Sequence, residues 1–194
     1  NLGIGGDRTQ HVLWRLDNGN IDGIAPKLAV IMIGTNNSKD NTAEEIADGI
    51  VAIVDRLRAR LPEMKVLLLG VFPREEKPGE TRDKLASVNA MAKARVADDA
   101  MVTFLDIGDR FLEPDGVMLK SMMHDFLHPG PHGYAVWADA IERHVAELLG
   151  DWKDNTPPPG FVRLWNGEDF TGWRGLVENP EKRLEMTPEE LAEK

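Results

Sequence analysis

Short, continuously apolar segments alternate along this chain with longer segments in which apolar residues recur every three or four positions. The apolar segments, residues 28–33, 65–71 and 102–105, have the length of strands that are buried on both faces. Strands that alternate with helices in units of about 30 residues predict a parallel sheet with helices on both of its faces. The pattern therefore predicts an α/β fold, in which ligands bind at the carboxyl ends of the strands.

Four segments have the pattern of amphipathic helices. The first covers residues 7–16 and ends at Asn18-Gly19. The second begins at Thr42, which forms a capping-box pattern with Glu45, and ends at Pro62. The apolar stripes of the two later helices are Leu85, Val88, Ala92 and Val96, and Tyr134, Trp137, Ile141, Val145 and Leu148.

The composition is that of a globular domain without cysteine chemistry. The absence of cysteine excludes disulfides, thiol catalysis and Cys-ligated zinc. A net charge of -10 makes nucleic acids and anionic membranes poor partners, and the sequence contains no transmembrane run. Because the chain opens on Asn1 rather than Met, we expect it to begin inside a domain, with any targeting segment before Asn1.

The composition changes after residue 149. Residues 150–159 contain three consecutive prolines and predict a stiff linker. Residues 160–194 open with a tryptophan-bearing β pattern and an Asn166-Gly167 turn. This segment is too short to bury a core of its own, so we expect it to be the start of a second domain.

Residues suited to catalysis follow the predicted strands. Gly5-Gly6-Asp7 is expected to follow a strand end near the start of the chain, and residues 34–37 (Gly-Thr-Asn-Asn) follow the first apolar segment. Asp125 and His128 lie in the loop after the third apolar segment. A carboxylate three residues before a histidine can orient that imidazole as a general base. Backbone and asparagine amides can stabilise an oxyanion, so these segments would supply most of an acyl-transfer site.

Each of these motifs also has a purely structural interpretation. Asp125 and His128 could form a surface ion pair at the start of a helix. Residues 34–37 could be a polar turn before the helix at Thr42. Gly5-Gly6 could form a tight turn, with Asp7 as the N-cap of the first helix, and the sequence favours this role for Asp7.

Other residues of reactive type are weaker candidates. His124 competes with His128, but it directly precedes Asp125, so its side chain is expected to point elsewhere. These residues have no further ligands nearby, so we expect no metal site. Arg74 is expected to be a solvated loop charge, and Trp14 a core residue.

The chain contains no convincing serine nucleophile. Ser87 falls inside a predicted helix, Ser121 lies only seven residues before His128, and Ser38 has no nucleophile-elbow pattern. A glycine-rich phosphate loop is also absent, which disfavours a flavodoxin-like nucleotide-binding protein.

The chain resembles the SGNH (GDSL-type) hydrolases in the order and spacing of three segments, residues 1–16, 34–37 and 125–128. Within that family it is most similar to the catalytic subunits of platelet-activating-factor acetylhydrolase. The resemblance covers residues 1–149 and implies a flavodoxin-like three-layer α/β sandwich with a parallel sheet. It implies that Gly6 and Asn36 form the oxyanion hole. It also implies that His128 is the catalytic base and Asp125 its orienting carboxylate.

In that family the nucleophile is a serine in a Gly-Asp-Ser block after the first strand. Such a block would precede Asn1, so the resemblance implies a domain truncated at its N-terminus. We therefore expect the chain as given to be inactive. The complete domain is expected to cleave small acyl (acetyl) esters by two-step acyl transfer without a metal or organic cofactor. The resemblance leaves room for a homodimer.

Residues 160–173 resemble the opening of 3-keto-disaccharide hydrolase-like domains, which are β-sandwiches. This second resemblance implies a multidomain protein, a carbohydrate ester as substrate and export from the cytoplasm. The alternative is a non-catalytic carbohydrate-binding or scaffold protein whose α/β domain has lost its nucleophile.

Overall fold

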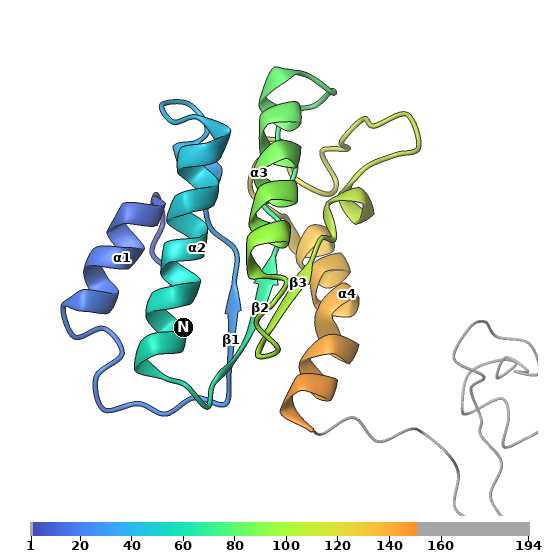
Figure 1. The fold of residues 1–194 in the computed structure, drawn as a ribbon. Helices are drawn as coiled ribbons and strands as arrows, with labels where there is room; N and C mark the ends of the chain where they lie inside the picture. The colour runs from blue at the N-terminus through green and yellow to red at the C-terminus, as the bar shows by residue number, and fades with distance from the viewer. Residues whose placement is uncertain (1, 151–194) are drawn as a thin grey trace, which may run out of the picture. The chain divides into compact units, whose positions relative to one another are not determined.

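A parallel three-stranded sheet lies at the centre of the computed structural model, which describes residues 2–150. The strands are β1 (Leu28–Ile31), β2 (Lys65–Leu69) and β3 (Val102–Leu105), in the order β1-β2-β3. Figure 1 shows the four α-helices packed around this sheet. The helices are α1 (Thr9–Asp17), α2 (Ala43–Arg60), α3 (Glu80–Val96) and α4 (Pro131–Leu149), with two 3-10 helices, η1 (Thr35–Asn37) and η2 (Gly108–Phe111).

The position of β2 in the middle of the sheet explains why its sequence is continuously apolar. Val66 and Leu68 belong to a core cluster with α1, α2 and α3, whereas Leu67 and Leu69 belong to a second cluster that α4 covers. Each of these four side chains is at most 2% exposed. Because successive side chains of a strand point to opposite faces, both faces of β2 are buried. The sheet is the middle of three layers, as the predicted α/β sandwich requires.

Helices α2 and α4 begin where the sequence predicts. The hydroxyl of Thr42 accepts a hydrogen bond from the Glu45 N–H at 3.2 Å, and the Glu45 carboxylate accepts one from the Thr42 N–H at 2.9 Å. The predicted capping box is therefore confirmed. Pro131 occupies the first turn of α4, where its missing N–H leaves no hydrogen bond unmade.

The start of the chain differs from the expectation. Residues 2–4 form no strand, and Gly5-Gly6 form a turn before α1. Within the described residues, β1 is hydrogen-bonded only to β2. A cavity of about 370 Å³ lies along β1, lined in part by Leu2, Ile4 and Val30.

Trp14 was expected in the core, but it is 66% exposed. The apolar stripe of α1 packs through Leu16, which is 3% exposed. Two residues correspond to about 200° of rotation around a helix, so Trp14 lies on the opposite side from Leu16.

No helix within residues 2–150 is both long enough and apolar enough to cross a membrane. The expected linker (150–159) and second domain (160–194) lie, apart from Gly150, outside the described residues.

Candidate active site

The loops that carry the candidate residues lie at the carboxyl end of the parallel sheet. The strands in Figure 1 point the same way, and the segments that follow them emerge at one end of the sheet. η1 follows β1, the segment around Arg74 follows β2, and the segment with Asp125 and His128 precedes α4. The tertiary structure thus brings these loops to one edge of the sheet, although they are spread over about 90 residues of the sequence.

Asp125 and His128 are in direct contact. Oδ2 of Asp125 lies 2.7 Å from Nδ1 of His128, and Oδ1 accepts the N–H groups of Leu127 at 3.1 Å and His128 at 2.8 Å. The hydrogen bond from the His128 ring, and then that from its backbone N–H, hold the pKa of Asp125 well below its usual value. An ionised Asp125 only accepts hydrogen bonds, so it selects the His128 tautomer that carries its proton on Nδ1.

The remaining ring nitrogen of His128 is therefore available as an acceptor. Its side chain is 70% exposed, and within residues 2–150 Nε2 makes no hydrogen bond. His124 also approaches Asp125, but its Nε2 lies 4.0 Å from Oδ2. The geometry favours His128 over its competitor as the nitrogen base that Asp125 orients.

Asn36 lies beside the Gly5-Gly6 turn. Its Nδ2 donates to the backbone carbonyl of Asp7 at 2.9 Å, which leaves the second N–H of the same amide available. Gly6 has a φ of 80°, a left-handed conformation that favours glycine, and its own N–H donates to no acceptor within residues 2–150. Two unused N–H donors thus come from segments about 30 residues apart in sequence.

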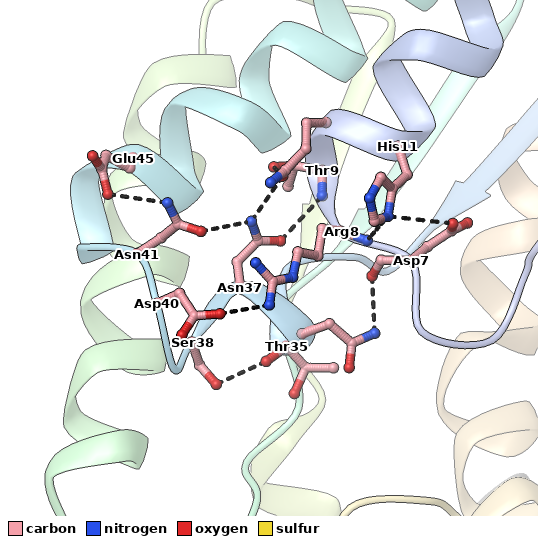
Figure 2. A network of polar contacts seen from close by, with 12 residues as sticks. Asp7, Arg8, Thr9, His11, Thr35, Asn37, Ser38, Asp40, Asn41 and Glu45 are labelled. Atoms are coloured by element: carbon pink, nitrogen blue, oxygen red, sulfur yellow. Dashed lines mark hydrogen bonds and ion pairs between the residues drawn. The ribbon is translucent and has the colours of Figure 1, made fainter.

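Asn37 connects these two segments, as Figure 2 shows. It is 2% exposed; its Oδ1 accepts the Thr9 N–H at 3.1 Å, and its Nδ2 donates to the side chains of Gln10 and Asn41, each at 3.0 Å. The sequence offered two interpretations of residues 34–37, an oxyanion donor at Asn36 and a polar turn, and it gave no separate role to Asn37. A buried amide that uses three hydrogen bonds fixes η1 against the start of α1.

Asp7 does not cap α1, so that prediction is wrong. The N-cap is Arg8, and the Asp7 carboxylate instead receives both terminal nitrogens of Arg15, at 2.8 and 2.5 Å. The hydrogen bonds from Arg15 hold the pKa of Asp7 below its usual value. The bidentate ion pair outweighs capping because both side chains are largely removed from water.

Arg74 is not the freely solvated charge that the sequence suggested. Its guanidinium donates to the backbone oxygen of Thr35 at 3.2 Å and lies 3.3 Å from the hydroxyl of Ser38. The segment after β2 is therefore tied to η1. The Ser38 hydroxyl itself donates to Thr35 O at 2.7 Å, which stabilises the turn that contains both residues.

No serine within residues 2–150 is hydrogen-bonded to His128. The same residues contain no group of three His, Cys, Asp or Glu side chains that could hold a metal ion. The described residues therefore bring together a candidate base with its hydrogen-bonded carboxylate and two candidate amide donors, which are residue types that an acyl-transfer site uses besides its nucleophile.

Known proteins are similar to this chain over most of the described residues. The model of the GDSL-like lipase/acylhydrolase family matches residues 1–136. Platelet-activating factor acetylhydrolase IB subunit alpha2 of Rattus norvegicus is 46% identical over 149 residues, which make up 77% of this chain and 65% of the relative. Subunit alpha1 of Homo sapiens is 41% identical, with 77% and 64% covered. The chain thus spans slightly less than two thirds of these relatives.

Solved structures show the same fold. A GDSL-like lipase from Bacteroides thetaiotaomicron superimposes with a TM-score of 0.65 at 22% identity, covering 76% of this chain and 75% of the other. A carbohydrate acetylesterase from Sinorhizobium meliloti gives a TM-score of 0.52 at 25% identity, covering 72% and 67%. From the family model and the relatives above 40% identity, the chain belongs to the GDSL-like lipase/acylhydrolase family.

Proposed function

We propose that the complete protein hydrolyses small acyl esters, with His128 as general base, Asp125 as its orienting carboxylate, and Gly6 and Asn36 as oxyanion donors. The observation that carries this proposal is the 2.7 Å contact between Asp125 and Nδ1 of His128, which leaves Nε2 without a partner in the described residues. A base must have its accepting nitrogen free and its other nitrogen fixed, and this pair meets both requirements.

The reaction would proceed by two-step acyl transfer. Nε2 of His128 takes the proton of a serine hydroxyl supplied by residues outside those described, and the serine oxygen attacks the ester carbonyl. The Gly6 N–H and the second Nδ2 proton of Asn36 hold the negative oxygen of the tetrahedral intermediate. His128 then gives its proton to the leaving alcohol, and water cleaves the acyl-enzyme in the second step. One oxyanion donor contributes about 3 kcal/mol to such a step.

An acetyl ester is the proposed substrate class. The matched relatives are named as platelet-activating factor acetylhydrolases, and one solved structure with this fold is a carbohydrate acetylesterase. Both names specify the acetyl group, whereas they differ in the alcohol. A carbohydrate alcohol, a homodimer and export therefore stay predictions, and the relatives' names give export no support.

The test is hydrolysis of p-nitrophenyl acetate by the full-length protein and two histidine variants. His128→Ala is expected to lower kcat by about 1,000-fold or more, because the serine then has no base. His124→Ala is the matched control: it removes an imidazole next to Asp125 that lies 4.0 Å away, and it should leave kcat within about twofold. Equal rates for wild type and His128→Ala would reject the proposed base.

A chain without the proposed nucleophile gives a second control. The described residues alone, 2–150, are expected to show no turnover above that of the His128→Ala variant, because acyl transfer needs the nucleophile. Full activity from this segment would show that one of its own serines acts instead. A full-length protein with no esterase activity on acetyl esters of any alcohol would favour the non-catalytic alternative.

A further inference from the structure

Two residues with strained backbones meet at one hydrogen bond next to the candidate base. Glu75 has a φ of 71° and Phe126 a φ of 57°, and within residues 2–150 they are the non-glycine residues with positive φ. The N–H of Glu75 donates to the carbonyl of Phe126 at 2.8 Å. Residues with side chains adopt this conformation only where the surrounding structure holds them in it.

Phe126 determines how Asp125 meets His128. Its own N–H donates to Met123 O at 2.9 Å, and the next two N–H groups, of Leu127 and His128, turn back to Oδ1 of Asp125. A left-handed residue at position 126 reverses the chain so that one carboxylate can accept both N–H groups and also Nδ1 of the ring. Whatever fixes the Phe126 peptide therefore fixes the Asp125–His128 pair.

Arg82, in the first turn of α3, binds the backbone carbonyl of Glu75. Arg82 is only 9% exposed. Its Nε donates to Arg74 O at 2.9 Å and one terminal nitrogen donates to Glu75 O at 2.6 Å, while the other donates to Gly116 O. The rigid fork of a guanidinium can bind three carbonyls in fixed directions, which an ammonium group cannot do.

The same side chain also anchors the segment that leads to His128. Gly116 lies between η2 and α4, and its neighbour Met118 donates its N–H to Glu76 O at 2.8 Å. Arg82 thus binds the segment after β2 and the segment after β3, which meet again at the bond between Glu75 and Phe126. Burial lowers the pKa of Arg82, so retaining a charged group here costs desolvation that the three carbonyls offset.

We propose that Arg82 is a positioning residue for the imidazole of His128, acting through the Glu75 N–H on the Phe126 peptide. The inference rests on the proposed function, since it assigns Arg82 a part in the same site. Loss of the three Arg82 hydrogen bonds loosens the turn at Phe126, so His128 spends less time in contact with Asp125. Because substrate binding does not require this contact, the effect falls on kcat rather than on KM.

The first test compares Arg82→Met with Arg95→Met in the full-length protein. Arg95 lies on the same helix but is surface-exposed and pairs with Glu44 and Asp48, so its variant controls for loss of an arginine from α3. Arg82→Met is expected to lower kcat by about 10- to 100-fold with little change in KM, and Arg95→Met to change neither. ¹⁵N NMR at neutral pH should show less of the Nδ1-protonated tautomer of His128 in Arg82→Met alone.

A second pair of variants applies if Arg82→Met does not fold. Glu75 is exposed, so Glu75→Gly and Glu75→Val leave the core intact. Glycine accepts the positive φ, whereas a β-branched side chain strongly disfavours it. Glu75→Val is expected to lower kcat and the Nδ1-protonated share of His128, and Glu75→Gly to retain both.

The two readouts separate this inference from the proposed function. The share of each His128 tautomer is measured without turnover. This measurement therefore tests the positioning role of Arg82 even if His128→Ala retains activity. A tautomer share that is the same in Glu75→Val and Glu75→Gly, or in folded Arg82→Met and Arg95→Met, would overturn the role of Arg82. A shift of the tautomer in Arg82→Met and Glu75→Val supports it.

Discussion

Asp7 combines two interactions that bear on the candidate site. Its carboxylate forms the bidentate ion pair with Arg15, and its backbone carbonyl accepts the side-chain N–H of Asn36. The ion pair therefore fixes the peptide that orients a proposed oxyanion donor. At the scale of single residues, Asp7, which the sequence predicted to be a helix cap, instead connects α1 to η1.

The Asp7 ion pair predicts a pH-dependent contribution to stability. Its folded-state pKa is lowered, chiefly by Arg15, so the contribution is fully present above the unfolded pKa of about 3.9 and is lost as pH falls through the folded pKa. Asp7→Asn should lower the free energy of unfolding by about 1–3 kcal/mol at pH 7. The difference from wild type should shrink as the pH is lowered below 4, as measured by urea unfolding.

The exposed pair between Asp22 and Arg60 supplies the control for this measurement. The Asp22 side chain is 65% exposed, so Asp22→Asn should change stability by about 0.5 kcal/mol or less. A constant difference between Asp7→Asn and wild type from pH 7 to pH 3 would contradict the assigned ion pair.

At the scale of elements, η1 is held by three neighbours. Asn37 connects it to α1, Arg74 connects it to the segment after β2, and the amine of Lys84 on α3 donates to the carbonyls of Ser38 at 2.8 Å and Asn41 at 3.2 Å. A short 3-10 helix has few hydrogen bonds of its own. Its orientation, and with it that of Asn36, depends on these contacts with other elements.

Asn37→Ala should therefore affect both stability and catalysis. It leaves the buried N–H of Thr9 without an acceptor, which is expected to cost about 1–3 kcal/mol of unfolding free energy. In the full-length protein it should also lower kcat, because the adjacent Asn36 loses its fixed position. Thermal unfolding and p-nitrophenyl acetate kinetics measure the two effects.

Asn41→Ala is the matched variant for Asn37→Ala. It removes one acceptor of the Asn37 amide but keeps the contact with Thr9, so it should cost clearly less stability. If the two variants behaved alike, the buried bond to Thr9 would not be the one that fixes η1.

At the scale of the whole molecule, the sheet is stabilised by burial on both of its faces. Leu67 faces the cluster under α4 and Leu68 the cluster under α2 and α3, and they are 0% and 1% exposed. Adjacent residues of one strand thus belong to two different cores. This arrangement keeps the carboxyl ends of the strands, and the loops that follow them, in fixed relative positions.

Leu67→Ala and Leu68→Ala should each lower the free energy of unfolding by about 2–5 kcal/mol, because each leaves a cavity in a closely packed layer. Val30→Ala on β1 is the control, since Val30 is 44% exposed and should cost about 1 kcal/mol or less. Chemical denaturation measures all three. A Leu67→Ala variant as stable as Val30→Ala would mean that α4 does not seal its face of the sheet.

Features that depend on neighbouring residues were predictable from the sequence. The strands at Leu28, Lys65 and Val102 begin where the apolar runs begin, because an apolar run of that length is stable only when buried. The capping box at Thr42 and the contact between Asp125 and His128 are both made across three residues, so their spacing alone indicates them. The start of the chain was less predictable, since residues 2–4 include the apolar Leu2 and Ile4 but form no strand.

The sequence by itself determined the order of the strands and helices, the α/β class, and the local contact between Asp125 and His128, because each depends on periodicity or on contacts a few residues apart. Only the tertiary structure decided that Asp7 pairs with Arg15 rather than capping its helix, that Asn37 rather than a turn alone fixes η1, and that Arg82 binds two loops. These contacts were undetermined because several polar partners were available to each side chain. Folding selects the partners that remain within reach once the two cores on β2 have packed.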